Sequence, residues 1–272
     1  MRIREPFNER GVALGIVVWF IAGMSLLVSG IIAEARVDTR LAQLHYAKAK
    51  AAAAGDGGIH LALAEQVARK QNKQKGSDRR RDLQIGGNIV AIRMIPSGLL
   101  VNISTEDVKG LTALFAMAQG RSQSETRRWR ASPEQLARAV VAYRDGVNGR
   151  RGNQFFSLED LMRVPGVDRA VFDGVRDYIV TENLAGNISG AAKNTGSRLR
   201  NLESAMSGEG AMLDGNVQLA ADQLRVDAIV RVGDQEWLRR RWVSLQGDNS
   251  NSLPWDILRS EAARPLGQRQ PI

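Results

Sequence analysis

The sequence contains no cysteine and only two histidines among its 272 residues. Disulfide bonds, cysteine nucleophiles and thiolate metal sites are therefore excluded, and two histidines are too few for a three-histidine zinc site. No His-Glu-x-x-His segment, nucleophile elbow or catalytically spaced pair of carboxylates is present in the sequence. These absences indicate a protein that is not an enzyme and that folds by packing or with the help of a non-thiolate ligand.

Aromatic residues make up only 5% of the chain, and acidic residues are fewer than basic ones, which leaves a net charge of +9. Such a balance favours contact with anionic surfaces, either nucleic acid or lipid headgroups, and it also serves solubility. The most basic stretch, 68–81, holds seven Lys or Arg residues and one Asp. Because no aromatic side chain is interleaved to stack on bases, we interpret this stretch as a solvated linker.

Charge is absent altogether from Gly11–Ala33, a run of 23 residues between Arg10 and Glu34. About 20 apolar residues are enough for a helix to cross the hydrocarbon core of a bilayer. Arg2 and Arg4 also precede the run, so the positive-inside rule predicts a cytoplasmic N-terminus and places the rest of the chain on the far side.

A cleaved signal peptide is the alternative interpretation of this run, because Ala33-Glu34-Ala35 imitates a cleavage site. The apolar core of a signal peptide spans only about 7–15 residues, so the length of the run favours a membrane anchor. The sequence therefore predicts a protein that crosses the membrane once.

Helical patterning continues beyond the apolar run. Val37, Leu41 and Leu44 follow helical spacing, and the alanine-rich tract at 47–54 has high helix propensity. The glycines within Gly55–Gly58 interrupt this pattern at a cost of about 1 kcal/mol each relative to alanine. The sequence leaves open whether a single helix runs through them.

Two β-hairpins are predicted, one on each side of a helical block. Their strands and turns are Asn88–Ile95 with Leu99–Ile103 around Pro96-Ser97-Gly98, and Leu224–Val232 with Glu236–Leu245 around Gly233-Asp234. A short strand at 254–258 precedes a frayed tail. Within the helical block, Ser104 or Thr105 is expected to cap the first helix, and Ser132-Pro133-Glu134-Gln135 forms a capping box at the start of the next. Ser197–Met206 predicts one more helix.

One segment of the block, 156–178, resembles a helix-hairpin-helix. Ser157 begins a short helix, Val164-Pro165-Gly166-Val167 forms a tight apolar turn, and Asp168 caps a second helix. In DNA-binding versions, a second glycine stands where this chain has Asp168, and backbone N–H groups there contact phosphate. A carboxylate at that point repels phosphate and satisfies the N–H groups itself, which weakens the DNA-binding interpretation.

The N-terminal segment resembles the type IV prepilin class, because a short basic leader and a glycine directly precede the apolar helix. In that class a prepilin peptidase cuts after the glycine, here Gly11, and methylates the new N-terminal residue, here Val12. Most pilins carry glutamate at the fifth mature position, where this chain has Ile16. The K-type minor pseudopilin of type II secretion systems characteristically lacks that glutamate, and the order of the later segments is also similar to that group.

The resemblance implies an α+β fold class: a long N-terminal transmembrane helix, a pilin-like antiparallel-sheet head and an inserted all-α domain that is helix-hairpin-helix-like. The expected segments are a prepilin leader at 1–11, the transmembrane half of the helix at 12–33, a periplasmic helix with basic linker at 34–86, the head at 87–103 plus 181–260, the insertion at 104–180 and a tail at 261–272.

The implied function is that of a minor pseudopilin at the tip of the type II secretion pseudopilus in the bacterial inner membrane, where it helps initiate assembly and export of folded proteins. The implied partners are the I- and J-type minor pseudopilins, the major pseudopilin, the prepilin peptidase and inner-membrane lipid.

Nucleic acid is not expected as a partner, although a membrane-anchored DNA-binding protein of competence type is the alternative. Some relatives bind calcium, but the loop Asp145-Gly146-Val147-Asn148 has too few carboxylates for about six to eight oxygen ligands, so no cofactor or metal is expected.

Overall fold

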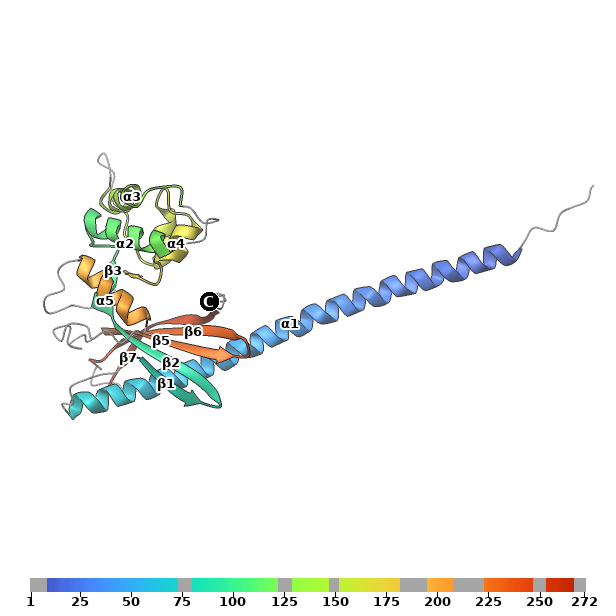
Figure 1. Cartoon of the computed structure of the whole chain (residues 1–272), viewed down its shortest axis with the longest axis horizontal. Helices are drawn as coiled ribbons and strands as arrows, with labels where there is room; N and C mark the ends of the chain where they lie inside the picture. Colours follow the sequence, from blue (N-terminus) through green and yellow to red (C-terminus); the bar gives the residue numbers. More distant parts are fainter. Residues whose placement is uncertain are drawn as a thin grey trace, which may run out of the picture. The chain divides into compact units, whose positions relative to one another are not determined.

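A computed structural model describes residues 9–72, 80–121, 129–146, 152–181, 195–207, 223–246 and 253–266. The chain divides into two compact units, residues 1–50 and residues 51–272. A long N-terminal helix and an antiparallel sheet with further helices confirm the predicted α+β fold class (Figure 1).

The first helix, α1, runs from Glu9 to Gln71 without interruption, so the glycines of Gly55–Gly58 do not break it. Residues 1–8 of the predicted leader lie outside the described residues. The described apolar side chains between Leu14 and Ile32 are exposed, whereas Ala51, Ile59 and Leu63 are buried in the second unit. One helix therefore carries both an uncovered apolar run and part of the core of the head.

The second unit is built on a five-stranded sheet in which every neighbouring pair is antiparallel. In spatial order the strands are β1 (Arg80–Ile85), β2 (Asn88–Pro96), β5 (Gln223–Val232), β6 (Gln235–Ser244) and β7 (Asp256–Pro265). The β1–β2 turn contains Gly86 and Gly87 at φ 53° and 77°, and Gly233 begins the β5–β6 turn at φ 60°. A positive φ is readily adopted by glycine, so these residues suit the tight turns that set the register.

The predicted hairpin between 88–95 and 99–103 is wrong. A 3₁₀ turn, η1 (Ser97–Leu99), leads the chain out of the sheet, and β3 (Val101–Asn102) instead pairs in parallel with β4 (Ile179–Val180). The backbone N–H of Val101 donates to the carbonyl of Tyr178 at 2.9 Å. The hairpin partner of β2 is β1, and β5 lies on its other side. The interpretation of 68–81 as a linker concealed β1, because that strand begins with basic residues.

The last strand is also longer than predicted, since β7 continues to Pro265 rather than ending near 258. Its pairing with β6 contains two register shifts. Its Glu261 lies near Arg240 of the neighbouring strand, and its Arg264 pairs with Asp177 in the turn that precedes β4. The charged residues near the C-terminal end of β7 therefore belong to a paired strand and not to the frayed tail that the sequence predicted.

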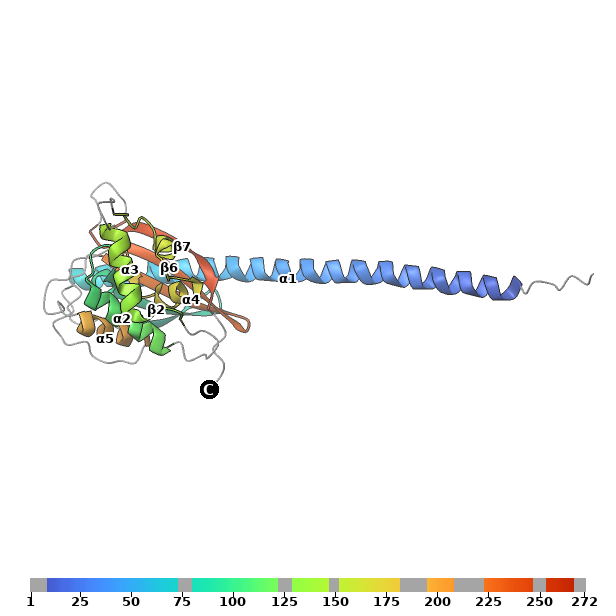
Figure 2. The same cartoon turned by 90° about the horizontal axis from the view of Figure 1, so that it is seen from above.

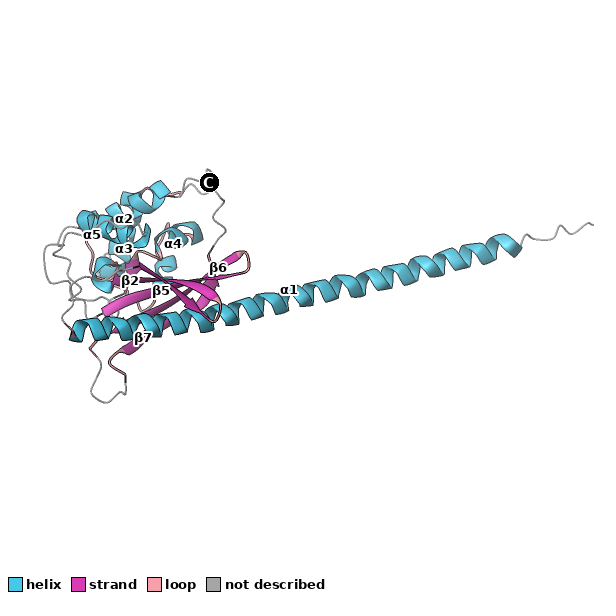
Figure 3. Ribbon diagram, turned by 60° about the horizontal axis from the view of Figure 1, so that its bottom comes forward, coloured by secondary structure: helices cyan, strands magenta, loops and turns pink. Residues whose placement is uncertain are grey.

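Helices cover the two faces of the sheet. Figures 1, 2 and 3 show the C-terminal part of α1 against one face and a group of shorter helices on the other. This group consists of α2 (Val108–Arg121), α3 (Pro133–Asp145), η3 (Leu158–Arg163), α4 (Arg169–Val175) and α5 (Thr195–Ser207). Their buried side chains form one cluster with Ile95 and Trp242 of the sheet, so the helical segment and the sheet share a hydrophobic core.

The N-terminal cap of α3 is the one that the sequence predicted, whereas the cap of α2 is a different residue. Ser132 and Gln135 form the predicted capping box of α3, with Pro133 in the first turn. At α2 the cap is neither Ser104 nor Thr105, because the carboxylate of Asp107 accepts from the N–H of Gly110 at 2.7 Å.

Glycine explains how closely α1 approaches the sheet. A Cβ added at Gly55 would lie 2.7 Å from Cβ of Arg239, and one at Gly58 would lie 3.0 Å from a methyl group of Val90. Between them, Asp56 accepts bonds from Arg239 at 2.8 Å and Arg241 at 2.8 Å. Burial alone would raise the pKa of Asp56, but these two arginines hold it below its ordinary value.

We expect Gly55→Ala to lower the free energy of unfolding by about 1–3 kcal/mol, because the added methyl group overpacks the contact with the sheet. The matched control is Gly57→Ala, whose nearest neighbour is a methyl group of Ile85 at 3.3 Å, and which gains helix propensity. Thermal unfolding of the full chain in detergent micelles, followed by tryptophan fluorescence, would measure both variants. An equal midpoint for Gly55→Ala and the wild type would contradict the close approach.

Candidate functional site

The N-terminal half of α1 is the first candidate site. It is long and apolar enough to cross a membrane by length and composition, and none of its described apolar window is buried. Gly11 and Val12 lie within the helical segment, although the structure does not describe their side chains. Ile16, at the position where most pilins carry glutamate, is 63% exposed. The helix is thus a candidate membrane anchor.

The helix-hairpin-helix-like turn is the second candidate. Val164 and Val167 are buried, and Gly166 between them has φ 88°, which allows the chain to reverse after Pro165. Asp168 accepts from the N–H of Val171 at 2.9 Å, so a carboxylate already occupies the start of α4. An incoming phosphate would meet negative charge at this point.

The loop that corresponds to the calcium-binding loops of some relatives, for which no metal is expected here, is described only as far as residue 146; its Val147 and Asn148 lie outside the described residues. Asp145 pairs with the neighbouring Arg144 at 2.7 Å. Within the described part of the chain, no group of three or more acidic or histidine side chains could hold a metal ion.

A buried cluster of charged side chains, which sequence reasoning missed, lies between the sheet and the helix group. Arg240 is its centre, with 2% of the residue exposed. Its guanidinium group donates to both carboxylate oxygens of Asp227, at 2.7 Å and 3.0 Å, and to Asp177 at 2.7 Å. Arg264 donates to the same oxygen of Asp177 at 2.9 Å, and Arg225 donates to the backbone carbonyl of Asp177 at 2.5 Å.

Opposite charges keep the carboxyl groups of this cluster ionised. Burial alone would raise the pKa of Asp227, but Arg225 and Arg240 outweigh that effect and hold the pKa below its ordinary value. For Asp177, burial is likewise opposed by Arg240, Arg264 and Arg225, and its pKa is strongly lowered. The same carboxylates raise the pKa of Arg240 in spite of its burial. Each ion is thus paired, as burial of charge requires.

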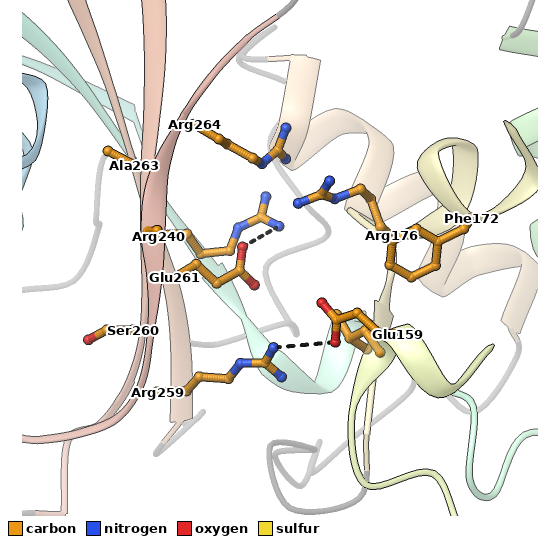
Figure 4. Close-up of a pocket in the computed structure, with 11 residues that line it drawn as sticks. Glu159, Phe172, Arg176, Arg240, Arg259, Ser260, Glu261, Ala263 and Arg264 are labelled. Atoms are coloured by element: carbon orange, nitrogen blue, oxygen red, sulfur yellow. Dashed lines mark ion pairs between the residues drawn. The ribbon is translucent and has the colours of Figure 1, made fainter. Parts of the chain in front are cut away.

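A cavity of about 410 Å³ opens beside this cluster. One wall is β7, from Arg259 to Arg264, and the other comes from η3 and α4 with Leu158 and Phe172 (Figure 4). These segments are about 100 residues apart in the chain, so no local pattern could have predicted the cavity. The one signal was Arg225-x-Asp227 within the largely apolar segment 224–230 of β5, where the spacing places both charges on the same face of the sheet.

No family model and no curated protein matches the sequence. Among solved structures, the chain is similar to a chain in the crystal structure of the GspK–GspI–GspJ complex from the type 2 secretion system of enterotoxigenic Escherichia coli. The identity is 12%, the TM-score is 0.46, and the match covers 84% of this chain and 99% of that one.

The depressed carboxyl pKa values predict acid sensitivity. A group with a lower pKa in the folded state contributes stability that is present above its unfolded pKa, about 4, and lost as the pH falls through the folded value. We therefore expect the free energy of unfolding to decline below about pH 4. Asp177→Asn should make this decline shallower, which denaturant unfolding between about pH 3 and pH 7 would measure. An unchanged slope would argue against the paired state of Asp177.

Removing one partner of the buried cluster should be costly. Asp227→Asn leaves Arg225 and Arg240 without their shared carboxylate, and we expect a loss of about 3–5 kcal/mol in the free energy of unfolding. Glu159→Gln is the control, because Glu159 is exposed and lies 4.0 Å from Arg259, a surface pair worth about 0–1 kcal/mol. Denaturant titrations of both variants at pH 7 would separate the two effects, and equal losses would contradict the assignment.

Proposed function

We propose that the chain is a pseudopilin, and more specifically a minor pseudopilin of K type in a type II secretion system. The observation that carries this proposal is the uncharged run Gly11–Ala33, which follows a short basic leader directly and belongs to a helix that continues unbroken into the core of the head. A signal peptide ends before its domain begins, whereas a pilin-type spine is shared by membrane and head. The continuity of α1 through Gly55–Gly58 supports the second case.

The orientation we propose has the N-terminus in the cytoplasm and the head in the periplasm, with the inner membrane around the apolar run. Arg2, Arg4 and Arg10 support it, because positive charge flanking a span is retained on the cytoplasmic side. Prepilin peptidase would cut after Gly11 and methylate Val12.

The partners we propose are the I- and J-type minor pseudopilins and the major pseudopilin. Val37, Leu41 and Leu44 support contacts of this kind, since they are exposed at helical spacing beyond the apolar run. Ile16 supports a place at the tip of the assembly. A buried carboxylate in the membrane needs a cationic partner such as the N-terminus of a neighbouring subunit, and a subunit with none above it has no use for glutamate there.

The DNA-binding alternative gains no support from the hairpin. Its helix α4 is seven residues long, and the carboxylate of Asp168 already accepts from the backbone at the helix start. Phosphate contact at that place would require two negative charges to approach each other.

The N-terminal sequence and the intact mass of the protein extracted from membranes test the proposal. We expect a start at Val12 with one extra methyl group. A soluble form that starts at Arg36 would show a signal peptide, and an uncut Met1 would show a plain anchor; both would overturn the prepilin assignment.

Gly11→Ala should block leader removal without preventing membrane insertion, because the peptidase reads the glycine whereas insertion depends on the apolar run. Gly15→Ala is the matched control in the same helix, since a methyl group there meets no other side chain within 4 Å. The mass of each variant extracted from membranes would show whether its leader has been removed. Normal processing of Gly11→Ala would count against the proposed function.

A further inference from the structure

The β7 wall of the cavity owes its charge to an irregularity in the strand. Leu238 is opposite Arg264 and Arg240 is opposite Glu261, so two residues of β7 fill the place across from the single residue Arg239. Side chains three apart normally face opposite sides of a strand, but this bulge turns Glu261 and Arg264 to the same face. The strand thereby presents both charges to the cavity.

Three guanidinium groups gather at one end of the cavity. Figure 4 shows Arg176 and Arg264 directed toward each other from opposite walls, with Arg240 beside them. Asp177 holds Arg240 and Arg264 through a single oxygen atom, at 2.7 Å and 2.9 Å. Cations so close together repel one another, and one more negative group here would reduce that repulsion.

Donor groups at this end lack acceptors within the described part of the chain. Nε of Arg264 is buried without a hydrogen-bond partner there. Arg176 lies 3.7 Å from Asp173, which is an ion pair beyond hydrogen-bond distance, and its guanidinium group is 5.9 Å from the centre of the Phe172 ring. Arginine presents a planar fork of donors that matches a carboxylate. Both side chains line the cavity and are partly exposed, Arg176 by 23% and Arg264 by 26%, so a ligand in the cavity can reach their guanidinium groups.

The remaining lining limits the kind of anion. Glu159 and Glu261 border the same cavity, the first beside Arg259 and the second 3.9 Å from Arg240. Their charge disfavours a ligand with several negative groups, such as a nucleic acid backbone. Phe172 and Leu158 supply an apolar wall against which a short aliphatic chain can pack.

We propose that this cavity binds a single carboxylate at the end of a short aliphatic chain, held between Arg176 and Arg264. Two sources have this chemistry: a glutamate side chain in a segment of a partner protein, and a free short-chain carboxylate. The site is independent of the proposed function, because it depends only on residues of the head.

The test uses the full chain in detergent micelles and a fluorescently labelled peptide, Thr-Val-Glu-Val-Thr, blocked at both ends. We expect fluorescence anisotropy to show saturable binding, and the counterpart with glutamine in place of glutamate to bind at least tenfold more weakly. Arg176→Gln and Arg264→Gln should each weaken binding at least fivefold. The control is Arg163→Gln, which removes an equal charge from an exposed position outside the cavity.

Competition identifies the source of the carboxylate. If butyrate displaces the peptide at a concentration near the peptide dissociation constant, the ligand is a free carboxylate; if it does not, the peptide backbone contributes and the source is a protein segment. Equal binding of the glutamate and glutamine peptides, binding unaffected by Arg176→Gln, or equal displacement by inorganic phosphate would overturn the proposal. Arg176→Gln keeps the test decisive if loss of the Arg264–Asp177 pair unfolds the other variant.

Discussion

The close contact between α1 and the sheet is the constraint on which the rest of the head depends. Gly55 and Gly58 let the helix backbone approach the side chains of β2 and β6, and Asp56 between them pairs with two arginines of β6. A glycine in a helix lowers its intrinsic stability, so the helix is retained here by packing rather than by propensity. The same helix carries the exposed apolar run, so this run and part of the core belong to one continuous element.

On the opposite face of the sheet, buried charged side chains need partners of opposite charge. β5 is covered on both faces, and its Arg225 and Asp227 point into the layer of short helices where no water can solvate them. Arg240 and Asp177 supply the missing partners, so the desolvation cost of each ion is offset by paired charge and hydrogen bonds. This geometry also couples the turn after α4 to the sheet, because Asp177 receives bonds from both β5 and β6 through its backbone and its side chain.

The edge strand β7 extends the cluster of charged side chains to the cavity, which it lines with Glu261 and Arg264. Its bulge and inward-facing charges are features that protect an edge strand from pairing with another chain. Beside the buried cluster they also create a cavity lined by Arg264, whose Nε has no acceptor within the described residues. In the role proposed for the chain, a carboxylate-binding cavity on the head would add a polar recognition element to the apolar contacts proposed for α1.

The sequence by itself determined the features that depend on local chemistry: the long apolar N-terminal helix, the fold class, the β5–β6 hairpin, the α3 capping box and the carboxylate at the start of α4. Each follows from apolar periodicity or from side chains that bond to their own backbone within a few residues. Only the tertiary structure decided that β2 pairs with β1 and not with β3, that β7 runs on to Pro265, and that Asp177, Arg225, Arg240 and Arg264 meet. Strand pairing and buried ion pairs join residues far apart in the chain, and their free energy depends on register and burial, which no local pattern specifies.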